Sequence, residues 1–228
     1  MERIKHWWRT EADKLRPMRW KQRFSYLFTY YKGWMLGFLA LLLLGSFLTD
    51  VYIQNQTPIA LQGFFTNDDW NLFPASKIAE AYTDTLPEDF AGRVVLDDAL
   101  YIDMTGEAGE YAAASNGKII AYITTGQLDF VVTTREVFDF LAPQMQFMDL
   151  AQVLPAADFA ALESQMQQGT DRDGNPIYPL LDMTQSRFVQ DSGFADAEGV
   201  AGTYCLFVPY NAPDTAQLAD FIRYAFGL

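Results

Sequence analysis

The chain has 228 residues, 50% of them hydrophobic, and a formal net charge of −13. The charge is divided unevenly, because residues 1–32 hold nine basic and three acidic residues whereas residues 50–228 hold seven basic and 26 acidic ones. The only cysteine, Cys205, excludes an internal disulfide. The short basic arm has no accompanying recognition fold, which argues against nucleic acid as a partner.

An uncharged stretch of seventeen residues, 33–49, separates Lys32 from Asp50. With the apolar residues up to Ile53 it reaches the roughly 20 residues that a helix needs to cross a hydrocarbon core of about 30 Å. We therefore expect a transmembrane helix over residues 33–53. A cleaved signal peptide is the alternative. It is disfavoured by the long basic segment before the apolar run and by the absence of an A-x-A site after it.

The uneven charge predicts the orientation of this helix. Basic residues next to a span are retained on the cytoplasmic side of the membrane. Residues 1–32 should therefore form a cytoplasmic arm, residues 33–53 should cross the cell membrane once, and residues 54–228 should form a domain outside.

The arm alternates aromatic and basic residues, such as Trp7, Trp8 and Arg9, then Trp20 and Lys21. Aromatic rings favour the membrane interface, and basic side chains are attracted to anionic headgroups. The pattern predicts a helix that lies on the inner leaflet of the lipid bilayer. A docking surface for a membrane protein partner is the second interpretation.

The outer part alternates strand-like and helix-like segments. Apolar runs predict strands over residues 59–65, 93–102, 128–132 and 203–208. Helices are predicted after Pro74, over residues 115–125 and 134–141, from Pro155 to Gly169, and after Pro213. Strands separated by crossover helices imply a single, mainly parallel sheet with helices on both faces. The predicted fold class is therefore α/β.

The last of these helices has the clearest amphipathic pattern. Its apolar residues recur at the spacing of one helix face: Leu218, Phe221, Ile222 and Ala225. The helix after Pro155 is expected to bury Met166 on its inner face and to end at Gly169.

Two passages resemble extracellular solute-binding proteins of the periplasmic-binding-protein-like fold. Residues 117–154 combine a helix that ends at Gly126, a strand that carries Asp129, and the turn Phe-Met-Asp-Leu. Residues 202–226 are similar to the last strand, Asn-containing turn and helix of the same proteins. The layout of arm, span and outer domain also looks like uncharacterised single-pass membrane proteins of Gram-positive bacteria. The resemblance implies a solute-binding-like outer domain, although this one is short for the usual two lobes.

A binding site in an open parallel sheet forms beyond the carboxyl ends of the strands. The candidate ligand-binding residues are those that follow the predicted strands: Asn67, Trp70, Thr133, Arg135 and Asn211. Their amide, hydroxyl, guanidinium and indole groups could together hold a small polar solute. The alternative is that several of them are turn residues and helix caps.

Metal binding and catalysis have little support in the sequence. The segment Asp171–Asn175 has alternate oxygen ligands around a glycine, but its spacing does not fit a calcium loop, and a tight turn is the simpler interpretation. Asp97 and Asp98 are adjacent, so they should face opposite sides of a strand. No histidine follows the span to activate Cys205, whose thiol we expect to be buried and inert. We expect no enzyme activity, metal or cofactor.

Two functional hypotheses follow. The first is a membrane-anchored, solute-binding-like module that binds a small polar ligand or presents a binding surface. The second is a structural or accessory protein of an envelope complex that acts through protein–protein contacts. A cavity ringed by the strand-end residues would favour the first, and an exposed apolar patch would favour the second.

Overall fold

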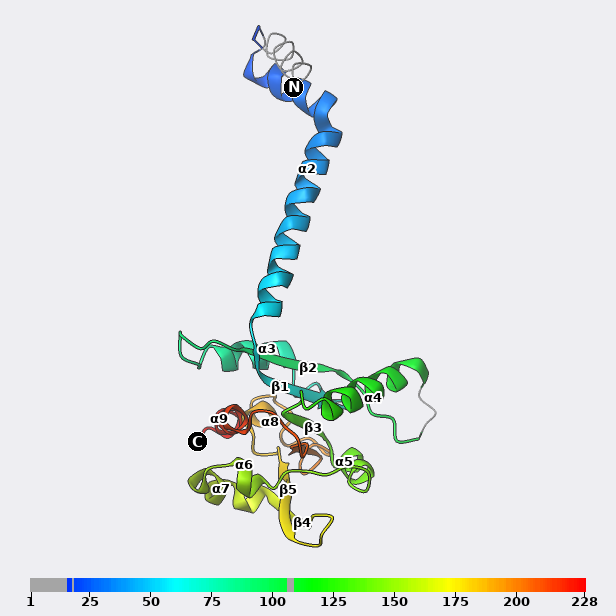
Figure 1. Ribbon diagram of the computed structural model, residues 1–228, viewed down its shortest axis with the longest axis vertical. Coiled ribbons are helices and arrows are strands. Elements are labelled where there is room, and N and C mark those ends of the chain that lie inside the picture. The colour runs from blue at the N-terminus through cyan, green and yellow to red at the C-terminus, as the bar shows by residue number, and fades with distance from the viewer. Residues whose placement is uncertain (1–15, 18, 106–108) are drawn as a thin grey trace. The chain divides into compact units, whose positions relative to one another are not determined.

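The computed structural model describes residues 16–17, 19–105 and 109–228 (Figure 1). The chain divides into two compact units that meet between Gln56 and Thr57, and each is described by itself below. Most of the expected membrane-surface helix in the arm, including Trp7, Trp8 and Arg9, lies outside the described residues.

The first unit contains one long helix, α2, which runs from Trp20 to Gln56. Its segment Lys32–Ile53 has 22 residues and is long and apolar enough to cross a membrane or to act as a signal sequence. At 1.5 Å per residue this segment is about 33 Å long, which matches the hydrocarbon core. The helical conformation expected for residues 33–53 is confirmed.

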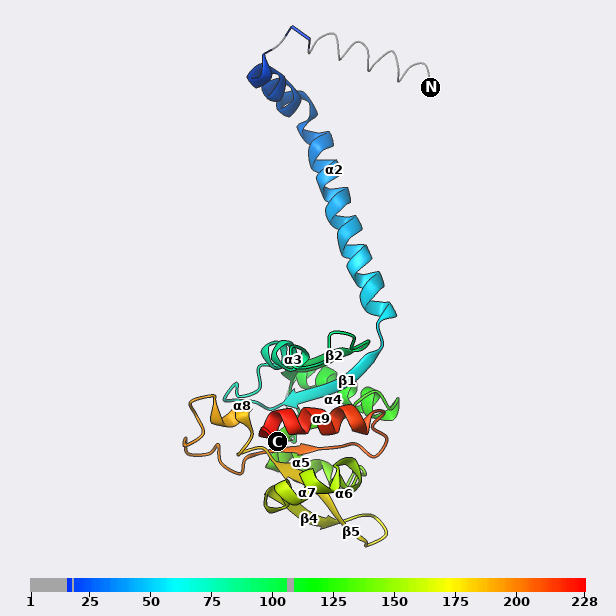
Figure 2. The ribbon, with the colours of Figure 1, turned by 90° about the vertical axis from the view of Figure 1, so that its left-hand side faces the viewer.

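The second unit is an α/β domain with one six-stranded sheet, in the order β2-β1-β3-β6-β5-β4 (Figure 2). The strands are β1 (Ile59–Thr66), β2 (Arg93–Leu100), β3 (Phe130–Thr134), β4 (Met166–Thr170), β5 (Pro176–Asp182) and β6 (Tyr204–Phe207). β1 runs parallel to β2 and β3, whereas the β3–β6, β6–β5 and β5–β4 pairs are antiparallel. The sheet is therefore mixed, and the prediction of a mainly parallel sheet is wrong.

The β4–β5 hairpin is the reason for this error. The predicted helix after Pro155 ends at Leu162, a 3₁₀ turn follows, and Met166 and Gly169 belong to β4. The tight turn expected at Asp171 is present: the Asp171 carboxylate accepts hydrogen bonds from the backbone N–H groups of Asp173 and Asn175. Because a hairpin reverses the chain without a crossover helix, β6 enters the sheet antiparallel to β3.

Helices cover both faces of the sheet, as predicted. They are α3 (Ala75–Thr83), α4 (Gly109–Thr124), α5 (Arg135–Leu141), α6 (Leu150–Val153), α7 (Ala156–Leu162), α8 (Arg187–Gln190) and α9 (Thr215–Phe226). One core cluster packs β1 and β3 against α3, α6, α8 and α9, and the other packs the opposite face against α4 and α5. Phe65 faces the first cluster and Phe64 the second, as the alternation along a strand requires.

The inner face predicted for α9 is confirmed, because Leu218, Phe221, Ile222 and Ala225 are all buried. Phe221 stacks on Phe130 of β3, with ring centroids 4.8 Å apart. Every residue of both core clusters comes after Thr57. The second unit therefore has a complete core of its own and should fold without α2.

A buried carboxylate joins three parts of this domain. Asp129, 2% exposed, accepts a hydrogen bond from the backbone N–H of Gln62 at 2.7 Å and another from that of Asp214 at 3.0 Å. Asp214 in turn caps the amino terminus of α9. Burial raises the pKa of Asp129 to about 6, although the two N–H donors act in the opposite direction.

Candidate functional site

Two of the five predicted ligand-binding residues have their side chains occupied inside the domain. The Asn67 amide donates to the carbonyl of Ile102 at 3.0 Å and accepts from its N–H at 2.9 Å. The fully buried Thr133 hydroxyl is hydrogen-bonded to the hydroxyl of Thr66 at 2.7 Å. As expected, Asn67 follows a parallel strand and Thr133 lies near the end of one. Their side chains, however, form hydrogen bonds to neighbouring segments of the domain.

The other three residues lie apart from each other. Trp70 packs against Phe194, with ring centroids 5.7 Å apart. Arg135 donates to Asp139 at 3.0 Å and to Gln167. Asn211 lies at the opposite end of the strands, where its amide donates to the carbonyl of Ile123 at 2.6 Å. The expected placement at one end of the strands does not hold for Asn211, because β6 is antiparallel to β3 and carries Asn211 away from the ends of β1 and β3.

A concave surface of the domain lies instead beside α5, and we call it the α5 groove. Helix α6 packs against β5 from one side, whereas α5 packs against β3 and β6 on the other, which leaves that face of the hairpin open. The wide end of the groove has a volume of about 570 Å³. It is lined by Phe138, Ala142, Pro143, Met145, Gln146, Phe147, Gly169, Thr170, Asp171, Arg172, Ile177, Pro179 and Tyr210.

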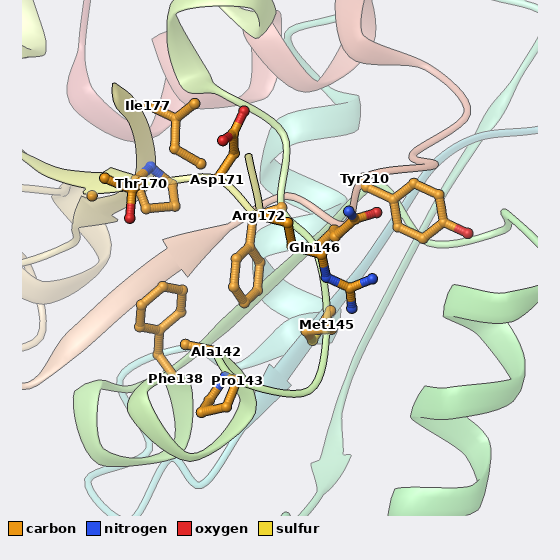
Figure 3. Close-up of a pocket in the computed structure, with 13 residues that line it drawn as sticks. Phe138, Ala142, Pro143, Met145, Gln146, Thr170, Asp171, Arg172, Ile177 and Tyr210 are labelled. Atoms are coloured by element: carbon orange, nitrogen blue, oxygen red, sulfur yellow. The ribbon is translucent and has the colours of Figure 1, made fainter. Parts of the chain in front are cut away.

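Figure 3 shows how two segments form the walls of this wide end. Phe138, Ala142 and Pro143 come from α5 and the loop after it, and Thr170, Asp171 and Ile177 face them from the hairpin. The floor is rigid and aromatic, since Phe138 packs on Phe147 at 4.9 Å and Phe147 on Phe207 at 5.2 Å between ring centroids. Such a floor offers an apolar surface to a ligand.

The rim of the wide end carries polar groups. The Asp171 carboxylate is held by the hairpin turn, chiefly by the Asn175 amide and N–H, and these hydrogen bonds lower its pKa. Arg172 forms no ion pair or hydrogen bond within the described part of the chain. The rim therefore offers a guanidinium group that is available to a bound partner.

A separate cavity of about 190 Å³, which we call the narrow end, lies beside the start of α5 where β6 begins and shares no lining residue with the wide end. Arg135 and Gln167 line it, together with Gln165, whose Oε1 is buried and has no hydrogen-bond donor among residues 19–105 and 109–228. A buried acceptor without a donor is unfavourable, so a bound N–H group would be stabilised there. Arg135 is thus the one predicted site residue that lines the groove.

Cys205 also faces the narrow end but is 3% exposed. Burial raises the pKa of its thiol, against the smaller lowering effect of Arg135, so the thiol stays protonated at neutral pH. The expectation of a buried thiol is confirmed. A protonated thiol is a weak nucleophile, and it adds apolar surface rather than chemistry to the groove.

The described residues contain no group of three or more His, Cys, Asp or Glu side chains that could hold a metal ion. Asp97 and Asp98 point to different partners, as their adjacency predicts. Asp97 pairs with Lys118 of α4, and Asp98 accepts a hydrogen bond from the N–H of Ala75 at the start of α3. Both carboxylates therefore hold helices against β2.

Comparisons with known proteins do not supply a function. No family model, no curated protein and no solved structure matches this chain. The chain is therefore described by its architecture, which is an amino-terminal apolar helix followed by a mixed six-stranded α/β domain. The α5 groove, which the sequence did not reveal, is the geometry from which a function can be argued.

Proposed function

We propose that the protein is a membrane-anchored binding module that adds an extended polypeptide segment to the edge of its sheet at β4. Side chains of the bound segment would enter the wide and narrow ends of the α5 groove. This form of recognition uses the backbone groups of an edge strand for affinity and adjacent cavities for specificity.

The observation that carries the proposal is the unprotected edge at β4. Soluble proteins protect edge strands with charges, prolines or covering elements. β4 has the sequence Met-Gln-Gln-Gly-Thr, without a charge or a proline, and it pairs with β5 alone. It also borders the groove along its length, since Gln167 lines the narrow end and Thr170 the wide end.

The register of the hairpin indicates which backbone groups of β4 are available. Thr170 lies opposite Pro176, which has no N–H to donate. We therefore infer that Thr170 and Pro176 form a non-hydrogen-bonded pair, in which the backbone N–H and C=O of Thr170 point away from β5. The pairing has a register shift between Gln167 and Gly169, and Gln168 has no partner in β5. If β4 keeps its alternation there, Gln168 also presents its N–H and C=O outward. Two residues of β4 can therefore receive a new strand without breaking the hairpin.

The charge of the outer part favours a basic segment. Residues 50–228 carry 26 acidic and seven basic residues, and such a field attracts cations over distances beyond direct contact. Gln165, with its free acceptor, and the acidic Asp182 lie at the narrow end. A Lys or Arg of the bound segment would find acceptors there.

The anchoring part of the proposal rests on the apolar segment of α2 and on the excess of basic residues before it. We propose that α2 crosses the cell membrane once, with the arm in the cytoplasm and the domain outside. Proteolysis of intact cells should then digest the chain after Tyr52 and leave the arm protected. A protected outer domain, or a mature protein that starts after the apolar segment, would contradict this topology.

A small solute in the wide end of the groove is the second candidate function. Its volume of about 570 Å³ is that of a small-molecule site, which is typically roughly 300 to 1,000 Å³. Gln146, Arg172 and Tyr210 would supply the polar contacts to such a solute. The strand-end residues Asn67 and Thr133 are not part of this version, because their side chains are already paired.

Display of random peptides against the domain, residues 57–228, tests the proposal. Selected peptides should be extended and basic, and their binding should slow hydrogen exchange at Gln168 and Thr170. Gln168→Pro removes the outward N–H and should abolish binding, whereas the matched Gln168→Ala keeps it and should bind.

Ala142→Phe separates the two candidates, because it fills the wide end and should abolish binding of a small solute. Backbone pairing of a peptide with β4 should persist, and only the peptide side chain that is accepted at the wide end should change. Peptides that bind Gln168→Pro as well as the natural domain would rule out strand addition.

A further inference from the structure

A second hollow lies on the other face of the sheet, between α3, α8 and the end of α9. It has a volume of about 360 Å³ and shares no residue with the α5 groove. Half of its lining comes from Lys77 and Ile78 of α3, Arg187 and Phe188 of α8, Phe194 and Tyr224. We call it the α3–α8 hollow.

Two cations without acidic partners meet at this hollow. Three of the seven basic residues after the apolar helix form ion pairs: Lys118 with Asp97, Arg135 with Asp139, and Arg223 with Asp158 and Asp220. Neither Lys77 nor Arg187 forms an ion pair with any described residue, although the domain is rich in acids. Asp191 is the one acidic residue that lines the hollow.

The guanidinium of Arg187 is held in place by an aromatic ring. Its central carbon lies 4.3 Å from the ring centroid of Tyr224. A guanidinium stacked in this way keeps its N–H donors in the plane of the group, where they can bind two oxygens of one anion. Lys77 adds a mobile ammonium from α3, so the two cations approach a ligand from different elements.

Apart from the polar Asn71, Asp191 and Ser192, the rest of the wall is apolar or aromatic. Leu72 and Ile78 are buried at the base, and Phe188 packs beside Tyr224, with ring centroids 6.1 Å apart. Phe194, 46% exposed, leans on Trp70 at the rim. An anion alone would leave this surface in contact with water, whereas an anion on an apolar body would cover it.

We infer that the α3–α8 hollow binds a small molecule that joins a carboxylate or phosphate group to an apolar body. Lys77 and Arg187 bind the anionic group, and Phe188, Phe194 and Tyr224 contact the body. The site is independent of the α5 groove and of any polypeptide bound there. The module therefore has two binding surfaces on opposite faces of one sheet.

Isothermal titration calorimetry on the full chain in a neutral detergent tests this inference with three probes: phenyl phosphate, benzoate and the uncharged benzyl alcohol. Both anions should bind, and benzyl alcohol should bind at least about tenfold more weakly, as charged hydrogen bonds of this kind imply. The double variant Lys77→Gln with Arg187→Gln should weaken the anions by about tenfold or more. Rising salt should weaken the natural protein in the same direction.

The matched control is Lys118→Gln, which removes a cation from the other face of the sheet, outside all of these cavities, and should leave binding unchanged. Arg187→Lys should bind more weakly than the natural protein, because it keeps the charge but loses the planar stack on Tyr224. Lys77→Gln alone, at an exposed position of α3, replaces the double variant if that variant does not fold.

Absence of binding by both anions, equal binding of benzyl alcohol, or an equal loss in Lys118→Gln would each overturn the inference.

Discussion

The two halves of the sheet are built by different means, and only one of them leaves a face open. In the parallel half, β2, β1 and β3 are joined by crossovers that place α3 on one face and α4 on the other. In the antiparallel half, β4 and β5 are joined by a hairpin that supplies no helix. The α5 groove lies beside that hairpin.

The two edges of the sheet differ in the same way. β2 carries Arg93, Asp97 and Asp98, and both α3 and α4 pack against it. β4 is shorter, uncharged and uncovered. Charges on an edge strand oppose pairing with another chain, whereas a bare edge permits it. A strand that is joined by helical crossovers is therefore covered, whereas a strand that is joined by a hairpin keeps an edge at which this domain can bind a partner.

The largest expected effect tests whether the two halves form one cooperative unit through α9. Phe221 contacts Phe130 of the parallel half at 4.8 Å and Phe188 of α8 at 5.9 Å between ring centroids. Phe221→Ala should lower the free energy of unfolding by about 3 to 5 kcal/mol, measured with urea on residues 57–228.

Ile120→Ala is the control, because Ile120 is 63% exposed on α4 and should change stability by less than about 0.5 kcal/mol. A loss below about 1 kcal/mol for Phe221→Ala, or two separate transitions in the natural domain, would mean that the halves unfold independently.

The second prediction concerns Asp129, which ties the parallel half to α9. Its pKa is raised from 3.8 to about 6, so the folded state binds this proton more tightly than the unfolded state does. Between these values stability should fall as pH rises, by an amount on the order of 2 kcal/mol for this group alone.

Asp68, whose pKa burial also raises, adds to the same trend, so the comparison must be made with a variant. Urea unfolding at several pH values should show a smaller fall for Asp129→Asn than for the natural domain between pH 4 and 6. Equal slopes would show that Asp129 does not contribute to the trend.

The smallest effect compares a glycine of the hairpin with a glycine of the parallel half. Gly174 has φ +82° in the hairpin turn, a conformation that disfavours any side chain, so Gly174→Ala should destabilise by about 1 kcal/mol. Gly117 lies inside α4 with open space around it, so Gly117→Ala should stabilise by up to about 1 kcal/mol. Thermal midpoints that move in the same direction for both variants would contradict this contrast.

Much of the parallel half could be predicted from the sequence, because its signals are local. β1 and β3 are continuous apolar runs, and α9 has a regular amphipathic spacing. β4 could not be recognised, since its two glutamines and a glycine have no strand pattern and form a strand through pairing with β5. Tertiary pairing of this kind overrides local preference.

The candidate site could not be predicted from the sequence for a related reason. The direction of β6 depends on the hairpin before it, so the position of Asn211 could not be known without the hairpin. The α5 groove exists because no helix covers one face of the β4–β5 hairpin, and no sequence motif marks such a surface. Arg135 lines the groove because α5 begins where β3 ends. The turn at Asp171 was the one local signal of the hairpin.

The single cysteine makes the opening of this domain measurable by its rate of alkylation. Cys205 lies in β6, where the antiparallel half joins β3, and its side chain is shielded on both sides by the folded sheet. Alkylation of this thiol must wait for the sheet to open, so its rate reports how often the two halves separate. No engineered label is needed, because the chain contains no other thiol that could react. A ligand that stabilises the hairpin would slow the reaction, and the ratio of the rates with and without the ligand would report that stabilisation in the full chain.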